Sequence, residues 1–255
     1  MTQNRRNLLI LGGIVGAIYG LRAVPWDRFP GRGLKYIAID GLPPFRTLDT
    51  GGQVSVGTVA FIGLDPADRD AEPRRARAEA IKADLCGALF GADVPPEVVP
   101  IAYFSEFRCP YCRVLERDLD EILAANPETL RLVQHELPIF GPPSELAARA
   151  SVAAARQGLQ QPLRRRFMRT SLVADEGSVL AVAAAAGLDT LRLARDMNAP
   201  EVQAELDRTR ALADVFGFIG TPGLVIGRTV LTGAVPASLL RRIIADEQSL
   251  APLAC

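Results

Sequence analysis

The chain has 255 residues, of which 49% are apolar and 23% are charged. This composition can bury one hydrophobic core of ordinary size together with an appendage, and it excludes a disordered chain. The 29 basic and 29 acidic residues give a formal net charge of zero, so there is no electrostatic case for a nucleic acid as partner.

An apolar run near the start predicts a targeting or anchoring segment over residues 1–24. Arg5 and Arg6 precede about fourteen apolar residues between Leu8 and Leu21, nearer the core of a signal peptide than the roughly twenty residues that span a membrane. The basic flank predicts that the N-terminus stays inside. A retained anchor and a cleaved signal both remain open, and either one predicts export to an oxidising compartment.

A Pro- and Gly-punctuated extension follows over residues 25–98. Two short strands are expected in it, at residues 43–48 and 54–62, and one charged helix over residues 72–89.

Two cysteines then lie between a predicted strand and a predicted helix. Residues 100–105 are an apolar run of strand length, and residues 113–125 repeat apolar side chains at helical spacing. Cys109 is therefore expected as the helix N-cap, with Pro110 at the first helical position and Cys112 one turn into the helix. Thiols at this spacing can interconvert between dithiol and disulfide, which predicts a redox site.

The helix start assigns different roles to the two cysteines. Free backbone N–H groups and the positive end of the helix dipole favour a thiolate on Cys109, and Arg108 and Arg113 add positive charge. Cys109 is the expected nucleophile. Cys112 is expected to be less exposed and to resolve the mixed disulfide that Cys109 forms with a substrate.

Two other uses of the cysteine pair fit the sequence less well. A structural zinc site needs four ligands, but the chain has no second Cys-x-x-Cys pair and a single histidine, His135, so we expect no metal. A structural disulfide that closes a four-residue loop would stabilise little. His135 lies in a strand predicted over residues 129–137, and its polar neighbours favour a surface residue over a base for Cys109.

The rest of the chain alternates helices with Gly and Pro boundaries and ends in a hairpin. Helices are predicted at residues 144–157, 162–170, 177–186 and 200–216. Residues 220–227 and 229–233 predict two hairpin strands, and residues 236–244 a closing amphipathic helix.

Three separated segments carry a family resemblance, and they occur in the right order. Residues 104–112, 136–150 and 217–227 resemble the exported DsbA-type thiol-disulfide oxidoreductases, which are thioredoxin-fold proteins. The resemblance covers roughly residues 99–247 and is far more specific than a lone Cys-x-x-Cys pair.

The resemblance implies an α/β, thioredoxin-like fold over residues 99–249, with a helical insertion at about 142–216 and a tail at 250–255. It also implies a cis peptide bond at Thr221-Pro222, beside the active disulfide, where the Thr221 backbone receives the substrate chain.

The chain departs from the family pattern at two places. Many relatives carry a buried acid six residues before the first cysteine, where this chain has Tyr103, while Glu106 matches an acid common in part of the family. Between the cysteines stand Pro110 and Tyr111, where the most strongly oxidising members have Pro-His, so a less extreme reduction potential is expected.

Two further cysteines, Cys86 and Cys255, predict a structural disulfide between the extension and the C-terminus, because an even leftover pair in an exported protein is usually bridged. The bridge would close a loop of about 170 residues, worth roughly 5 kcal/mol as an upper estimate. The alternative is two independent cysteines, one buried and one free on the tail.

These features predict an exported thiol-disulfide oxidoreductase that needs no metal or organic cofactor. Its expected substrates are reduced or misoxidised secreted proteins, which it oxidises before a quinone-linked membrane oxidase recharges it. The alternatives are an isomerase or reductase kept reduced by a membrane electron donor, and a tethered binding or chaperone module. The expected location is the periplasmic side of the bacterial inner membrane, anchored by the N-terminal segment, or the periplasm after cleavage.

Overall fold

The computed structural model of this protein describes residues 33–49, 71–92, 94–170 and 175–253. The predicted segment 1–24 and the strand predicted at residues 54–62 lie outside the described residues. Within these four ranges, no helix combines the length and the apolar character that crossing a membrane requires. From Tyr36 onward the chain forms one unit, to which the following description applies.

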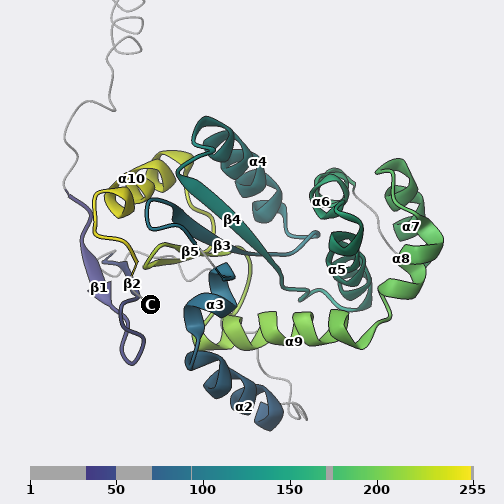
Figure 1. Cartoon of the computed structure of the whole chain (residues 1–255), viewed down its shortest axis with the longest axis horizontal. Helices are drawn as coiled ribbons and strands as arrows, with labels where there is room; N and C mark the ends of the chain where they lie inside the picture. Colours follow the sequence, from purple (N-terminus) through teal and green to yellow (C-terminus); the bar gives the residue numbers. More distant parts are fainter. Residues whose placement is uncertain (1–32, 50–70, 93, 171–174, 254–255) are drawn as a thin grey trace, which may run out of the picture. The chain divides into compact units, whose positions relative to one another are not determined.

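A mixed sheet of six strands runs through this unit in the spatial order β1-β2-β6-β5-β3-β4 (Figure 1). The strands are β1 (Tyr36–Ala38), β2 (Arg46–Leu48), β3 (Val99–Ser105), β4 (Leu130–Glu136), β5 (Gly223–Ile226) and β6 (Thr229–Thr232). β3 pairs in parallel with β4 and antiparallel with β5, and β5 and β6 form the predicted hairpin. Parallel neighbours need a crossover, which α4 (Pro110–Ala125) supplies between β3 and β4.

Both faces of β3 are covered, and all seven of its residues are buried. Side chains alternate between the two faces of a strand. Tyr103 and Ser105 contact residues of the helices on the α4 side of the sheet, while Ala102 and Phe104 belong to the apolar core on the opposite side. This strand therefore separates two environments, and the cysteine pair follows directly after it.

Helices pack on both faces of the sheet. Figure 1 shows α4 and α10 (Ala237–Gln248) on one face, and α3 (Leu85–Phe90) and α9 (Pro200–Val215) on the other. The core on the α3 and α9 side is aromatic: the ring of Phe218 lies 5.0 Å from Phe104 and 5.9 Å from Phe216 between centroids.

Between β4 and β5 the chain forms the expected helical insertion. It consists of α5 (Pro142–Ala154), a short 3-10 helix (Ala155–Gln157), α6 (Gln160–Arg169), α7 (Glu176–Ala185), α8 (Thr190–Asp196) and α9. The sequence analysis does not predict α8, because seven residues are too few to display a helical period. Its N-cap Asp189 accepts a hydrogen bond from the backbone N–H of Arg192 at 3.0 Å.

The extension adds strands and helices to this same unit. β1, which the sequence analysis does not predict, pairs with β2, and β2 joins β6 in parallel. Phe45, just before β2, packs edge-on against Phe216 with 5.1 Å between ring centroids. The single helix predicted over residues 72–89 is two helices, α2 (Ala71–Lys82) and α3, because Asp84 starts a new helix by accepting a hydrogen bond from Gly87 N–H at 3.0 Å.

His135 is buried, so its interpretation as a surface residue is wrong. Only 1% of it is exposed, its ring stacks on Phe104 with 4.6 Å between centroids, and its Nε2 lies 2.8 Å from the carbonyl oxygen of Leu89 in α3. The strand alternates as predicted, but α3 of the extension covers the face that carries His135. Burial lowers the pKa of His135 to about 4, so the ring is neutral at physiological pH.

Candidate active site

The two cysteines occupy the start of α4 as the sequence predicts. Cys109 is the N-cap and Pro110 begins the helix. The Cys109 sulfur accepts a hydrogen bond from the backbone N–H of Cys112, with 3.4 Å between the atoms. Both cysteines are free thiols, and the exposed fraction is 3% for Cys109 and 0% for Cys112. The helix start thus leaves a small exposed area on Cys109 and buries Cys112 completely.

The surroundings of the two thiols push their pKa values in opposite directions. The hydrogen bond from the Cys112 thiol is the largest cause that lowers the pKa of Cys109, to about 6, and the backbone N–H groups of Cys112 and Tyr111 lower it further while burial opposes them. Burial raises the pKa of Cys112 above its usual range. Near neutral pH the pair therefore holds a thiolate on Cys109 and a protonated thiol on Cys112.

Thr221 and Pro222 lie beside this pair, although they are more than a hundred residues away in sequence. The Thr221-Pro222 peptide bond is cis, and the carbonyl oxygen of Thr221 lies 3.4 Å from the Cys109 sulfur. The N–H of Gly233 donates to the carbonyl oxygen of Pro222 at 2.8 Å. The hairpin thereby presents the backbone of Thr221 at the reactive sulfur.

Glu106 holds the loop between β3 and α4. Its buried carboxylate accepts hydrogen bonds from the backbone N–H groups of Arg108 and Ile139, both at 2.9 Å. The guanidinium of Arg113 donates to the carbonyl oxygens of Phe107 and of Thr170 at the end of α6. These two side chains fix the loop that carries Cys109, from the β4 side and from the insertion.

Tyr103 occupies the position where many relatives of the resembled family carry an acid. It is fully buried, and its hydroxyl donates to the carbonyl oxygen of Cys112 at 3.0 Å. Burial raises the pKa of the Tyr103 hydroxyl above its usual range, so this side chain stays protonated and supplies a hydrogen-bond donor where an acid would supply a charge.

A buried charge cluster lies next to the site and was not predicted from the sequence. The guanidinium of Arg164 in α6 is fully buried and donates to Glu116 of α4 at 2.8 Å, to Ser105 of β3 at 3.0 Å, and to Glu136 of β4. Ser151 of α5 adds a hydrogen bond to Glu136 at 2.6 Å. One arginine thus joins the insertion to β3, to the edge strand β4 and to the helix of the cysteines.

The sequence holds a signal for this cluster. In α6 the buried residues Leu163, Arg164, Phe167 and Met168 form one apolar stripe at helical spacing, and Arg164 stands inside it. Glu116 likewise stands inside the buried stripe of α4. Charged residues are almost never fully buried unless they are paired, so opposite charges in two apolar stripes indicate a buried ion pair.

Exposed apolar side chains surround the loop of the cysteines. Tyr111 is 61% exposed and Ile219, two residues before Thr221, is 49% exposed. The exposed side chains of Ile139 and Phe140 follow β4 next to Glu106. Apolar groups at these places can contact a bound polypeptide.

Cys86 lies on α3, on the face of the sheet opposite to α4, and it is disulfide-bonded. Its predicted partner Cys255 lies outside the described residues, so the pairing stays a prediction. Leu253, two residues before Cys255, lines a cavity of about 150 Å³ together with Cys86. In the described part of the chain, no three His, Cys, Asp or Glu side chains gather in a way that could hold a metal ion.

Comparisons with known proteins agree with this geometry. The family of DSBA-like thioredoxin domains matches residues 100–245. A thioredoxin-like oxidoreductase from Silicibacter pomeroyi DSS-3 is 37% identical, with a TM-score of 0.60 over 65% of this chain and 98% of that one. A periplasmic thioredoxin-like protein from Salmonella enterica serovar Typhimurium is 23% identical, with a TM-score of 0.55 over 66% and 98% of the chains. The thiol-disulfide exchange protein alpha-DsbA2 from Wolbachia pipientis is 20% identical, with a TM-score of 0.58 over 71% and 97%.

Among curated proteins, the Na(+)/H(+) antiporter NhaA of Herminiimonas arsenicoxydans is 29% identical over 141 residues, which are 55% of this chain. The chain spans only 22% of the length of that relative.

Proposed function

The chain belongs to the family of DSBA-like thioredoxin domains and is a thiol-disulfide oxidoreductase with a Cys-x-x-Cys pair, and on this premise we propose that it oxidises dithiols in exported proteins. The observation that carries the proposal is the unequal setting of the two thiols. The Cys109 sulfur accepts a hydrogen bond from the backbone N–H of Cys112, while Cys112 is completely buried, which lowers the pKa of Cys109 and raises that of Cys112. A stabilised thiolate favours the reduced form of the pair, and a stable reduced form makes the disulfide an oxidant.

The reaction begins with the disulfide form of the pair. A substrate thiolate attacks the Cys109 sulfur, the bond to Cys112 breaks, and the electron pair leaves on the Cys112 sulfur, which takes up a proton because of its raised pKa. A second substrate thiolate attacks the substrate sulfur of the mixed disulfide, and Cys109 leaves as a thiolate, which its low pKa favours. The substrate loses two electrons and the enzyme gains them.

The substrate chain is proposed to lie along Thr221. Its carbonyl oxygen is within 3.4 Å of the Cys109 sulfur, so a polypeptide whose cysteine bonds to Cys109 must pass this backbone. The exposed side chains of Tyr111, Ile139, Phe140 and Ile219 would contact apolar residues of an unfolded segment. Both features support reduced or misoxidised secreted proteins as substrates.

The proposed location is the periplasmic side of the bacterial inner membrane. It is supported by the basic flank and the apolar run of segment 1–24 in the sequence, and by the periplasmic description of the Salmonella relative. A membrane oxidase, with a quinone as the final acceptor, would return the pair to the disulfide form. Anchoring and cleavage are equally compatible with this location.

The equilibrium reduction potential of the Cys109–Cys112 pair, measured against a glutathione buffer, tests the proposed direction. We expect a value of about −120 to −180 mV, the range of disulfide donors. A value of about −230 to −270 mV would instead assign the protein to the reductants and direct the search to a membrane electron donor.

Two variants test whether the cysteine pair carries the oxidising activity. Cys109→Ser removes the sulfur that the substrate attacks, and Cys112→Ser removes the other sulfur of the disulfide, so each variant should lose the oxidation of a dithiol peptide. Full activity of Cys109→Ser would refute the redox function and favour a binding or chaperone module.

A further inference from the structure

Helix α6 carries four arginines and no acidic residue. Arg164 is the buried one, and the other three have different surroundings. Arg165, Arg166 and Arg169 are exposed. Arg164 binds two carboxylates, but none of these three side chains has an ion pair or another polar partner within the part of the chain that the structure describes. Among the described residues, three guanidinium groups on one short helix are thus without a counter-charge, in a chain of zero net charge.

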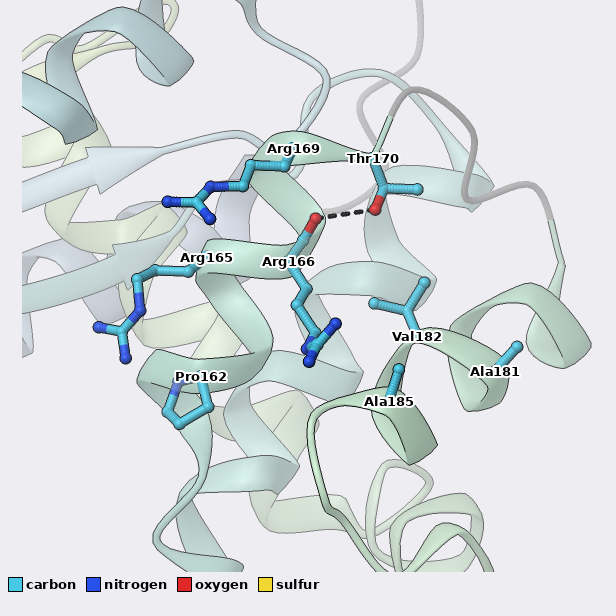
Figure 2. Close-up of a pocket in the computed structure, with 8 residues that line it drawn as sticks. All are labelled: Pro162, Arg165, Arg166, Arg169, Thr170, Ala181, Val182 and Ala185. Atoms are coloured by element: carbon cyan, nitrogen blue, oxygen red, sulfur yellow. Dashed lines mark hydrogen bonds between the residues drawn. The ribbon is translucent and has the colours of Figure 1, made fainter.

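These arginines line a hollow of about 620 Å³ between α6 and α7. Figure 2 shows Arg166 extending between the two helices, toward Ala185, with Val182 and Ala181 along the α7 side. It shows the guanidinium groups of Arg165 and Arg169 on the side of α6 that faces away from α7. The hollow therefore combines positive charge from one helix with small apolar side chains from the other.

A second hollow of about 220 Å³ continues this surface toward α4. Arg165 and Arg169 line it together with Arg113 and Arg117 of α4. Its acidic residues are Asp120 and Glu116, and the carboxylate of Glu116 is already bound to Arg164. We call the five arginines 113, 117, 165, 166 and 169 the arginine surface.

The arginine surface starts at the redox loop. The guanidinium of Arg113 donates to the carbonyl oxygen of Phe107, two residues before Cys109, and to that of Thr170, one residue after Arg169. Arg113 follows Cys109 by only four positions in α4. When a polypeptide is bonded to Cys109, the residues on either side of its bonded cysteine therefore lie close to the start of this surface. Because the partner is already joined to Cys109, its flanking segment has a high effective concentration at this surface, so even a weak contact there can change the rate of the reaction.

The chemistry of the surface specifies its partner. A guanidinium presents a planar fork of donors that matches a carboxylate, and it stays charged at every physiological pH. We propose that the arginine surface binds an acidic segment of the protein whose thiols react at Cys109, and thereby gives this enzyme a preference for acidic partners. This inference rests on the proposed function, because it assigns the class of partner to the same site.

The test compares two dithiol peptides that are identical around their cysteines and differ in one flank, which is rich in Glu in one peptide and in Gln in the other. The full chain in its disulfide form should oxidise the acidic peptide about tenfold faster at low salt, since several exposed ion pairs act together. The preference should disappear at about 1 M salt, where the Debye length is about 3 Å. Equal rates at low salt would overturn the proposal.

Charge reversal locates the effect. Arg165→Glu with Arg169→Glu should remove or invert the preference while the reduction potential of the cysteine pair stays unchanged. The matched control is Arg75→Glu with Arg241→Glu, which makes the same change of charge at exposed arginines of α2 and α10 and should keep the preference. An equal loss in both double variants would show a general charge effect and overturn the docking surface.

A binding measurement separates this proposal from the proposed function. Fluorescence anisotropy of the two flank peptides without cysteines requires no redox chemistry. If the acidic flank binds the wild-type chain and not the Arg165→Glu/Arg169→Glu variant, the surface stands even where neither dithiol peptide is oxidised. If the acidic flank does not bind while anionic vesicles or inorganic polyphosphate do, the surface serves another anion and the proposal fails.

Discussion

The two faces of the central sheet differ in what they bury, and the difference begins at neighbouring pairs of residues. Phe104 of β3 is paired with His135 of β4, and the next pair is Ser105 with Glu136. The first pair faces the aromatic core under α3 and α9, and the second faces Arg164 and the helix of the cysteines. One face therefore holds the extension to the domain by apolar packing, and the other holds charges next to the thiols.

Because the two faces differ in this way, a substitution should lower the free energy of unfolding for a different reason on each face. In a buried ion pair, each charge offsets the cost of burying the other. Removing one member therefore leaves a buried charge without a partner, which is strongly destabilising. An apolar face loses stability in proportion to the contacts removed. Four predictions test the comparison, ordered from the largest expected effect to the smallest.

Substitution Arg164→Met removes the centre of the charged face. It leaves Glu116 and Glu136 buried without their cation, and we expect the free energy of unfolding to fall by about 3 to 5 kcal/mol, measured by denaturant titration. Adding Glu116→Gln and Glu136→Gln to the same chain should recover much of this loss. A change in the free energy of unfolding below about 1 kcal/mol, which is typical of a surface ion pair, would show that the cluster contributes no more than exposed charges do.

On the other face, Cys86→Ser tests whether a bridge to Cys255 holds α3 in place. If the two are paired, we expect a loss of about 2 to 5 kcal/mol in the free energy of unfolding. Cys255→Ser should cause the same loss, and the double variant no more than either alone. Mass spectrometry of a non-reduced digest checks the pairing directly, and a free thiol on the Cys86 peptide would refute it.

Acid should weaken the apolar face through His135. Its folded-state pKa of about 4 lies below the ordinary histidine pKa of 6.5, so the unfolded chain binds a proton more readily than the folded one. The stability contributed by the neutral ring is complete above pH 6.5 and is lost as the pH falls toward 4, by about 3 kcal/mol in total.

The readout for His135 is the difference in pH dependence between the wild-type chain and His135→Gln, which removes the titration and leaves the carboxylates to titrate in both. The slope of stability against pH should be smaller in the variant between pH 4 and 6.5. Identical slopes would mean that the ring is accessible to protons in the folded state.

The smallest effect is expected for Tyr103→Phe on the charged face. The substitution keeps the ring and removes the hydrogen bond to the carbonyl oxygen of Cys112, which should lower the free energy of unfolding by about 1 kcal/mol. Because the hydroxyl is uncharged in both redox states, the reduction potential should not change. A clear shift in the potential would assign Tyr103 to the redox chemistry.

Much of the domain could be predicted from local sequence. The crossover from β3 through α4 to β4, the β5–β6 hairpin and the helix start at Cys109 follow from side-chain periodicity and from Pro110. These features depend on residues that are near each other along the chain. The three-residue β1, the break between α2 and α3 and the short α8 carry too few residues for a period to show.

The sequence by itself determined the chemistry of the site, because two thiols at a helix start need only four consecutive residues to acquire different roles. Tertiary structure alone decided which polar residues are buried and with what partners. Glu116 and Glu136 reach Arg164 from 48 and 28 residues away, and α3 covers His135 from 46 residues away. Whether a side chain is buried depends on the element that packs over it. The periodicity of a sequence indicates which face of a helix or strand is buried, but it does not identify the element that packs there.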